Sequence, residues 1–246
     1  MVGELEGKVA IITGASGGIG LATAQLFNEK GARVVLAARS AEAIETEAQK
    51  LPGSIAIPTD MRDLDAVREL IAQAHAHYGR VDILINNAGQ GMGGAVESFD
   101  VDEFRSVFEL NVVSVVVAMQ AVIPLMREQG GGSIVNISSG LTKTLRPGVG
   151  PYAATKAMLD KLSHTARVEL EKDGIAVSVV HPFITQTGFF ANAAGGGHGG
   201  SEAVPSGADT PEYVAELILQ AVQTKAPEVV AEKVRAFAAQ QVSVQQ

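Results

Sequence analysis

Short, unbroken apolar runs alternate along this chain with longer segments in which apolar residues recur at helical spacing. Apolar runs separated by helices are typical of parallel strands whose sheet is covered on both faces. We expect strands at Val9–Ile12, Val34–Ala37, Ser54–Ile57, Val81–Ile85, Ser133–Ile137, Ile175–Val180 and Val229–Val230. We expect helices at Gly18–Lys30, Ala41–Lys50, Leu64–Tyr78, Val101–Leu110, Val112–Gln129, Tyr152–Lys172 and Pro211–Gln223. The pattern therefore predicts an α/β fold with helices on both faces of a parallel sheet.

Glycine and proline mark the ends of several of these elements. Gly31 and Gly79 follow two of the expected helices, in the position where glycine commonly ends a helix. Pro211 stands at the expected first position of the last helix. We see no domain boundary and no internal repeat, so residues 1–246 are expected to form a single domain. The glycine-rich stretch Gly188–Gly207 is either a surface loop or a mobile lid over a site.

The composition narrows the possible classes of protein. The chain of 246 residues is 46% hydrophobic and 19% charged, which suits a globular protein with a sizeable core. Its net charge of -8, without a basic cluster, argues against nucleic acid as a partner. The absence of cysteine excludes disulfides, thiolate catalysis and cysteine-ligated zinc. The histidines form no metal-binding pattern, so no metal is expected.

The most membrane-like run is Val112–Met126. It is interrupted by Ser114 and Pro124 and is shorter than the ~20 apolar residues that a membrane span needs. We interpret it as a helix buried in the core or at a subunit interface. The segment Met1–Lys8 lacks the basic-then-apolar pattern of a signal sequence. A cytoplasmic protein with no membrane span is the expectation.

A glycine-rich turn, Thr13–Gly20, lies between the first expected strand and the first expected helix. Gly14, Gly18 and Gly20 follow the strand and open the helix, which is the context of a dinucleotide site. Glycine lets the backbone approach a pyrophosphate, which then lies at the positive helix N-terminus. Three residues separate the first two glycines, so the spacing differs from the common G-x-G-x-x-G pattern. A plain tight turn is the alternative.

The end of the second expected strand bears on the choice of dinucleotide. An NAD site places an acidic residue there for the ribose 2′-OH, but this chain has Arg39 followed by Ser40. A guanidinium can bind a 2′-phosphate through two hydrogen bonds, which favours NADP(H) over NAD. Arg39 could instead be an ordinary surface residue. Asp60 could bond the adenine amino group or could cap the following helix.

Tyr152 and Lys156 stand four residues apart and therefore share one helix face. An ammonium group one turn from a phenol favours phenolate and lowers a pKa that starts near ~10. Ser139 lies thirteen residues before Tyr152. Its neighbour Ser138 is the alternative, but on a strand the two hydroxyls point to opposite sides.

Together these motifs resemble those of the short-chain dehydrogenase/reductase (SDR) family, in the branch whose length matches this chain. The likeness runs from Lys8 to about Val230, with the motifs in the family's order. It implies a Rossmann-type, doubly wound parallel sheet. The family's serine usually precedes its tyrosine at the spacing found for Ser139, so we prefer Ser139 to Ser138.

The resemblance also implies roles for the matching residues. Tyr152 would be the general acid in reduction and the base in oxidation, and Ser139 would bond the substrate oxygen. Lys156 would bind the nicotinamide ribose and depress the pKa of Tyr152. Asn111 would hold a water in a proton relay that ends at Lys156. The chemistry agrees, because hydride transfer to a carbonyl builds negative charge on an oxygen that a phenol and a hydroxyl can stabilise.

Cofactor contacts are implied for the glycine turn and for the ends of the later strands. The positions are Gly14, Ser16, Gly18, Ile19, Gly20, Arg39, Ser40, Asp60, Met61, Asn87, Ala88, Gly89, Tyr152, Lys156, Pro182, Ile184 and Thr187. The chain departs from the family at two places. Phe183 stands where the family often has glycine, and Gly17 stands where many NADP-using members have a basic residue.

The expected function is an NADP(H)-dependent oxidoreductase acting on a small-molecule carbonyl or secondary alcohol. A 3-oxoacyl thioester, a small ketone, a sugar and a steroid all remain possible substrates. Its pocket would be lined by residues 91–95, 141–150 and 183–207, with Lys143 and Arg146 as candidate anion contacts. The alternative is a non-enzymatic dinucleotide-binding regulator or scaffold on the same fold.

Assembly is suggested by valines that nearly encircle the helix expected after Asn111. A helix that is apolar all round is buried. The family resemblance implies a homotetramer formed through the helices near Val101–Gln129 and Tyr152–Lys172 and through the C-terminal strand region. The alternative is a monomer that buries these helices internally.

Overall fold

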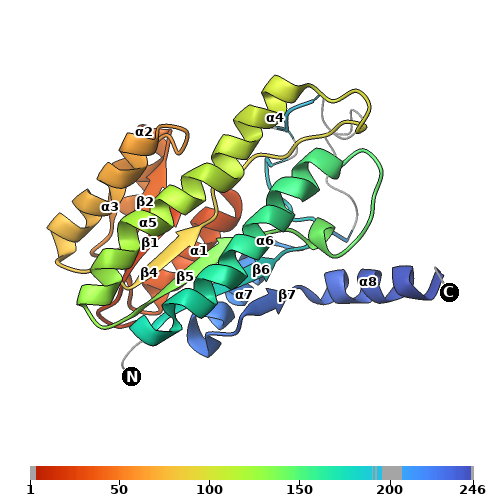
Figure 1. The fold of residues 1–246 in the computed structure, drawn as a ribbon. Helices are drawn as coiled ribbons and strands as arrows, with labels where there is room; N and C mark the ends of the chain where they lie inside the picture. Colours follow the sequence, from red (N-terminus) through yellow and green to blue (C-terminus); the bar gives the residue numbers. More distant parts are fainter. Residues whose placement is uncertain (1–3, 190, 192, 196–206, 245–246) are drawn as a thin grey trace.

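A seven-stranded parallel sheet forms the centre of the molecule in the computed structural model, which describes residues 4–189, 191, 193–195 and 207–244 (Figure 1). The strand order is β3-β2-β1-β4-β5-β6-β7, and every neighbouring pair is parallel. The strands are β1 Val9–Thr13, β2 Arg33–Ala38, β3 Ile55–Pro58, β4 Ile83–Asn86, β5 Gly132–Ile137, β6 Ile175–His181 and β7 Glu228–Val230. The predicted Rossmann-type sheet is confirmed as a single domain.

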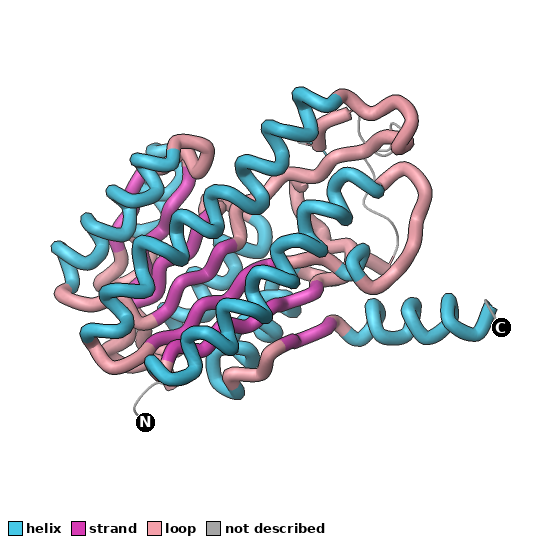
Figure 2. Tube along the Cα trace, viewed as in Figure 1, coloured by secondary structure: helices cyan, strands magenta, loops and turns pink. Residues whose placement is uncertain are grey.

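Helices cover both faces of this sheet (Figures 1 and 2). One face carries α1 Gly18–Glu29, α2 Ala41–Ala48 and α7 Pro211–Thr224, and the other carries α3 Leu64–Tyr78, α5 Ser114–Glu128 and α6 Gly150–Leu170. Side chains alternate between the two cores, since Ile12 packs on the first face and Ile11 on the second. Both faces being buried explains why the strands appear in the sequence as continuous apolar runs.

The chain reverses its direction of winding between β1 and β4. It proceeds outward from β1 to β3 and then returns to β4 on the other side of β1. In open parallel sheets, ligands bind in the crevice that such a reversal leaves at the carboxyl ends of the strands. The topology therefore places the expected site beyond the ends of β1 and β4.

The two helices predicted around Asn111 are one continuous helix, which corrects the prediction. It consists of α4 Val101–Phe108, a π-helical turn η1 at Glu109–Val113, and α5. A π-turn accommodates an extra residue without ending the helix, and such turns occur frequently at functional sites. The helix Val101–Glu128 is long and apolar enough to cross a membrane, but 56% of its most apolar window is buried inside the protein. It thus has the burial of a core helix.

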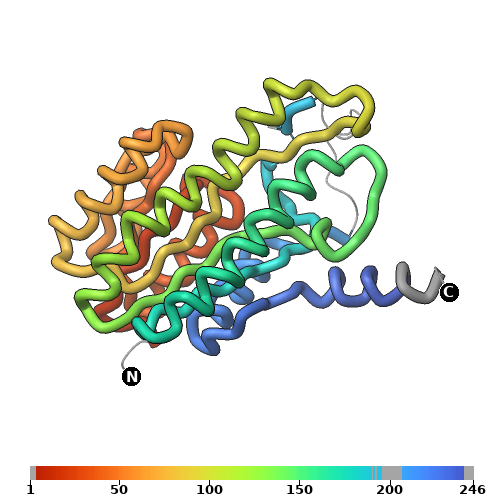
Figure 3. The backbone as a smooth tube through the Cα atoms, viewed as in Figure 1, coloured from red at the N-terminus to blue at the C-terminus, as the bar shows by residue number. Residues whose placement is uncertain are grey.

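A C-terminal helix, α8 Glu232–Val244, was missed by the sequence patterns. It follows β7 and extends past the end of the sheet (Figure 3). Val234 in its first turn is buried, whereas Phe237 is 52% exposed. Because the side chains at positions 235–240 of α8 are mostly exposed, no clear helical periodicity marks this part of the helix in the sequence.

The start of α3 supplies a test of the local structure. Asp63, not Asp60, caps this helix, since its carboxylate accepts hydrogen bonds from the backbone N–H groups of Asp65 and Ala66. We expect Asp63→Ala to lower the free energy of unfolding by about 1 kcal/mol. Asp60→Ala is the matched control and should leave the urea midpoint close to that of wild type. Equal destabilisation by both substitutions would contradict the assignment of the cap.

Candidate active site

A cleft of 1790 Å³ runs along the carboxyl ends of the strands. It exceeds the roughly 300–1,000 Å³ of an ordinary small-ligand pocket, so a dinucleotide and a substrate can be held together. Every predicted site residue lines this cleft except Gly20 and Asn111. The fold thus brings together residues from Gly14 to Thr187 in one place.

The glycine turn forms one wall of the cleft. Gly14 and Gly18 have positive φ values of 67° and 53°, which side chains rarely adopt. A Cβ at Gly18 would lie 2.8 Å from the Cγ2 of Thr187 across the cleft. A Cβ at Gly20 would collide with the carbonyl oxygen of Gly14, so Gly20 lets α1 approach the turn closely instead of lining the site. The exposed N-terminus of α1 offers backbone N–H groups to a pyrophosphate.

Hydrogen bonds between the ends of β1 and β4 hold this turn in place. The Thr13 hydroxyl accepts from the backbone N–H groups of Asn87 and Ala88, each at 3.0 Å. The Asn87 amide donates to the carbonyl oxygen of Thr13 at 2.9 Å. Asn87 therefore supports the cradle as well as lining it, and Thr13 has a positioning role that sequence reasoning did not assign.

Two arginines line the adenosine end of the cleft. Arg39 and Ser40 follow β2 and are exposed, and the Ser40 hydroxyl makes no capping bond to α2. Asp60 is also exposed and accepts a hydrogen bond from the backbone N–H of Arg62. The Arg62 guanidinium, which the sequence analysis missed, donates to Gln90 Oε1 at 2.6 Å. Because Arg39 and Arg62 both line the cleft, it is suited to an anionic group.

Ser139 and Tyr152 meet at the inner end of the cleft. The Tyr152 phenol is buried and forms a hydrogen bond with the Ser139 side chain. The Ser139 hydroxyl also accepts from the backbone N–H of Leu141 at 3.2 Å. In contrast, the Ser138 hydroxyl is buried with no hydrogen-bond partner among the described residues. The geometry therefore places Ser139, and not Ser138, beside the phenol.

Lys156 is buried one turn after Tyr152. Its ammonium donates to the carbonyl oxygen of Ile137 at 2.8 Å and lies 6.0 Å from the centroid of the Tyr152 ring. Burial lowers the pKa of Lys156 to about 8, although the nearby Asp160 carboxylate opposes this by raising it. The ammonium can therefore lose its charge near pH 8.

Burial acts on Tyr152 in the opposite sense from the one expected. It raises the pKa of the phenol above its ordinary value, and the hydrogen bond with Ser139 only partly offsets this rise. The prediction that Lys156 lowers the pKa of Tyr152 is therefore wrong for the protein side chains by themselves. The reason is that burial destabilises the charged phenolate more than its hydrogen bond with Ser139 stabilises it.

Asn111 lies behind the cleft, in the π-turn, and is fully buried. Its side-chain oxygen accepts from the backbone N–H of Gln90 at 2.9 Å, and its amide donates to the Gln90 carbonyl oxygen and to the Thr155 hydroxyl. Asn111 thus ties the loop after β4 to α6. Thr155, next to Lys156, is a second positioning residue that sequence reasoning missed.

The segment after β6 closes the cleft opposite the glycine turn. Among the described non-glycine residues only Lys225 has a positive φ, so Phe183 occupies the family's glycine position without backbone strain. Phe183 packs partly against the core beneath α7. Thr187 faces Gly18, in keeping with the prediction that both line the cofactor site.

The substrate end of the cleft is largely apolar. Its apolar lining comprises Met92, Val107, Leu141, Leu145, Phe189, Val234 and Phe237. Arg146 lines it as predicted, but Lys143 does not, because its ammonium pairs with Glu228 outside the cleft. Residues 196–206 of the glycine-rich segment lie outside the described residues. Among the described residues, no group of three potential ligands could hold a metal.

This geometry agrees with what comparison with known proteins shows. Residues 8–195 match the sequence model of short chain dehydrogenases. The chain belongs to the short-chain dehydrogenase/reductase family. Members of the family bind nicotinamide dinucleotides and catalyse oxidation or reduction of small molecules, so the chain is an SDR oxidoreductase.

Individual relatives of this SDR cover most of the chain. An uncharacterised oxidoreductase of Staphylococcus aureus is 36% identical over 191 residues, covering 76% of this chain and 82% of that protein. The crystal structure of a short-chain dehydrogenase from Streptomyces avermitilis superposes with a TM-score of 0.84 at 31% identity. The match covers 96% of this chain and 92% of that chain. A 7α-hydroxysteroid dehydrogenase complexed with NADH and 7-oxo glycochenodeoxycholic acid has a TM-score of 0.83 at 28% identity. The match covers 92% of this chain and 93% of that chain.

The buried lysine predicts how activity depends on pH. Since the pKa of Lys156 is about 8, its ammonium is lost as the pH rises through this value. We expect kcat/KM for ketone reduction to fall with a midpoint near pH 8 and to remain high at lower pH. A profile measured from pH 6 to 10, corrected for the stability of the nucleotide, checks this. A flat profile over that range would show that the charge on Lys156 is not needed.

Proposed function

We propose that this SDR uses NADP(H) to interconvert a carbonyl and a secondary alcohol on a small, largely apolar substrate. The observation that carries the proposal is the Ser139–Tyr152 hydrogen bond at the inner end of the cleft, one helical turn from the buried Lys156. The apolar lining beyond this pair favours a substrate with a hydrocarbon body over a sugar.

The direction of the Tyr152 pKa shift favours the reductive half of this chemistry. Burial keeps the phenol protonated at neutral pH, so Tyr152 can donate a proton to the oxygen of a bound carbonyl. The Ser139 hydroxyl donates a hydrogen bond to the same oxygen and stabilises the charge that develops there. When bound, the nicotinamide supplies the hydride. The proton lost from Tyr152 is then replaced from solvent.

Lys156 and Asn111 support this step from the protein side. The ammonium of Lys156 stabilises the negative charge left on Tyr152 after proton donation. Asn111 holds the loop after β4 against α6, which keeps the wall of the cleft at a fixed distance from Tyr152. The neighbouring glycine, Gly89, allows this close approach, because a Cβ there would lie 3.1 Å from Asn111 Oδ1 and 3.4 Å from Lys156 Nζ.

Substitution of Tyr152 tests the proton transfer directly. We expect Tyr152→Phe to lower kcat by about 10²- to 10⁴-fold while leaving the dissociation constant for NADPH unchanged, since only the hydroxyl is removed. Lys156→Ala should impair both turnover and cofactor affinity. A panel of apolar ketones followed by NADPH absorbance provides the assay, with Ser138→Ala as the control that should remain active. Near-normal turnover by Tyr152→Phe would falsify the assignment.

The proposed preference for NADP rests on the residues after β2 and β3. Arg39 is exposed at the adenosine end with no acidic residue at the preceding position, which is Ala38. Arg62 also lines the cleft and adds a second positive charge to it. Gly17 supplies no cation inside the glycine turn, so we expect the preference to be moderate.

Measured dissociation constants decide the cofactor question. A charge-assisted hydrogen bond contributes about 1.5–3 kcal/mol, or roughly 10- to 150-fold in affinity. We expect Arg39→Ala to weaken NADPH binding towards the lower end of that range and to leave NADH binding unchanged. Ala38→Asp should shift the preference towards NADH, because a carboxylate accepts from the 2′-OH and repels a phosphate. Equal binding of both cofactors by wild type would refute the preference.

We also propose that the protein assembles as a homotetramer through the outer surface of α4, α5 and α6. Exposed apolar side chains on these helices support this, namely Val101 on α4 and Met158 and Val168 on α6. Met158 and Val168 stand ten positions apart on α6, so their side chains point about 80° apart around the helix axis. Water contact with exposed apolar side chains is unfavourable unless another surface covers them.

Light scattering at micromolar concentration tests the assembly. A tetramer has four times the chain mass of 25.5 kDa. We expect Val168→Glu to lower the measured mass, because a carboxylate would be buried in the interface. Ala76→Glu, on the exposed face of α3, should leave the mass unchanged. A wild-type mass equal to that of one chain would rule the proposal out.

A further inference from the structure

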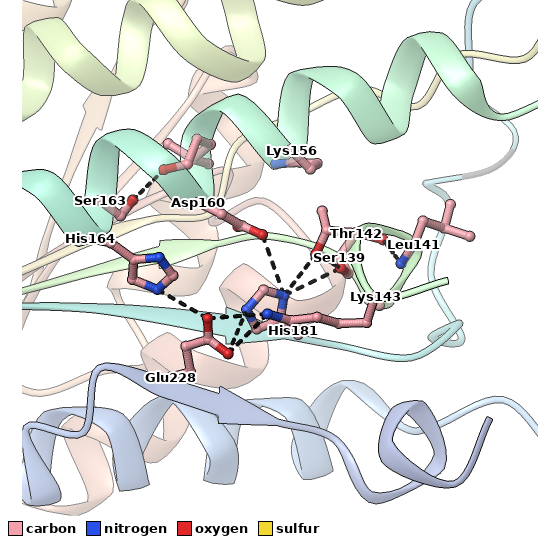
Figure 4. Close-up of polar contacts among 12 residues, drawn as sticks. Ser139, Leu141, Thr142, Lys143, Lys156, Asp160, Ser163, His164, His181 and Glu228 are labelled. Atoms are coloured by element: carbon pink, nitrogen blue, oxygen red, sulfur yellow. Dashed lines mark hydrogen bonds and ion pairs between the residues drawn. The ribbon is translucent and has the colours of Figure 1, made fainter. Parts of the chain in front are cut away.

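A partly buried cluster of ionisable side chains lies directly behind the Ser139 turn (Figure 4). At its centre is His181, the last residue of β6, whose side chain is 0% exposed. Among the described residues, the charged groups that act on His181 are Asp160 from α6, Glu228 from β7 and Lys143 from the turn that carries Ser139. His164, also on α6, pairs with Glu228. The proposed reaction uses none of these groups directly, although the cluster contacts the catalytic turn.

His181 holds the Ser139 turn through its Nδ1 atom. This nitrogen lies 3.3 Å from the carbonyl oxygen of Ser139 and 3.2 Å from the Thr142 hydroxyl oxygen. The Thr142 hydroxyl itself donates to the Ser139 carbonyl at 3.0 Å, so it is left as an acceptor towards the imidazole. The arrangement therefore requires a proton on Nδ1, which donates to both oxygens.

Asp160 links the same cluster to Lys156. Its Oδ2 lies 3.9 Å from His181 Nδ1, and its charge raises the pKa of Lys156 against the lowering effect of burial. Asp160 and Lys156 are four residues apart on α6 and so share a face. The other oxygen, Oδ1, is buried with no hydrogen-bond partner among the described residues. Keeping a carboxylate in this position costs stability, which calls for a functional reason.

We propose that His181 and Asp160 are positioning residues of the active site: His181 fixes the turn that aims the Ser139 hydroxyl at Tyr152, and Asp160 retains the positive charge on Lys156. The inference rests on the proposed function for its kinetic tests. Glu228 completes the cluster, because it lies 3.7 Å from His181 Nε2 and binds Lys143 and His164 on its solvent side.

The protonation state of His181 agrees with this role. Burial lowers the pKa of His181, an effect that Lys143 adds to and that Asp160 and Glu228 oppose. The folded protein therefore keeps the imidazole neutral, with its single proton on Nδ1. Because an unfolded histidine takes up a proton below about pH 6.5, stability falls as the pH drops below that value. Removal of His181 should abolish this part of the pH dependence of the urea midpoint.

Asn and Leu at position 181 separate positioning from packing. The amide nitrogen of Asn can occupy the place of Nδ1, whereas Leu offers no donor. We expect His181→Leu to lower kcat on the order of 10²-fold with little change in the KM for NADPH, because the serine is misplaced. His181→Asn should recover most of kcat and should also lose the acid-side fall in the urea midpoint. His77→Asn, at an exposed site on α3, is the control.

The outcomes for this pair of variants are unambiguous. A folded His181→Leu enzyme with wild-type kcat overturns the positioning role, and an Asn variant as slow as Leu overturns the donor role of Nδ1. Should His181→Leu fail to fold, Thr142→Val removes the bridging hydroxyl alone. That variant is expected to lower kcat while keeping the KM for NADPH, and an unchanged kcat would refute the proposal.

Asp160→Asn tests the electrostatic role at constant shape. We expect the alkaline limb of the kcat/KM profile to move to lower pH by about one unit, since an opposite charge nearby is lost. Asp173→Asn, which removes a partly exposed carboxylate paired with Arg127, should not move it. Titration of isotopically methylated Lys156 by NMR provides a readout that does not depend on turnover. An unchanged pKa of Lys156 there would overturn the role of Asp160 even if the proposed function itself failed the Tyr152→Phe test.

Discussion

Burial of the parallel sheet on both faces is the constraint on which the rest of this structure depends. Because helices cover both faces, polar side chains that must reach a ligand can emerge only where strands end. The reversal of winding between β1 and β4 opens a crevice at those ends. Thr13 and Asn87 then join the two strand ends by hydrogen bonds and hold the glycine turn against α1.

The reactive end of the cleft takes ionisable groups out of water, and this decides their chemistry. Burial raises the pKa of Tyr152 and lowers that of Lys156, so the phenol keeps its proton and the ammonium is held less firmly. Buried charges are costly unless they are paired or hydrogen-bonded. Each group here has such a partner: Ser139 for the phenol, and the Ile137 carbonyl oxygen with the Asp160 charge for the ammonium.

The helical layers are tied to one another by buried polar side chains as well as by apolar packing. Asn111 joins the π-turn to the loop after β4 and to Thr155 on α6. Asn136 joins β5 to Ser163 on α6 and accepts from Asn86 on β4. Such networks favour one arrangement of the helices, because another arrangement would leave more polar groups unpaired in the core. They therefore fix where Tyr152 and Lys156 stand relative to the strand ends.

The sequence by itself determined most of the elements of this protein, its fold class and its family. The signals used were local: unbroken apolar runs, glycines that end helices, and the glycine turn. Local signals can be interpreted without knowledge of distant contacts. Tyr152 and Lys156 also form a local pair, since helical spacing alone puts them on one face. The choice of Ser139 over Ser138 came from the serine-to-tyrosine spacing of the family, and the structure agrees, since Ser139 and not Ser138 bonds the Tyr152 phenol.

Only the tertiary structure decided the surroundings of the ionisable groups, namely their contacts and their exposure to water. Asp160, His181 and Glu228 lie far apart in the sequence, and their meeting depends on the packing of α6 against β6 and β7. The direction of the Tyr152 pKa shift was mispredicted because spacing reveals the neighbouring lysine but not the loss of water around the phenol. The continuity of the helix through Asn111 and the presence of α8 likewise depended on burial. Desolvation and long-range contact are properties of the folded chain, which no local pattern contains.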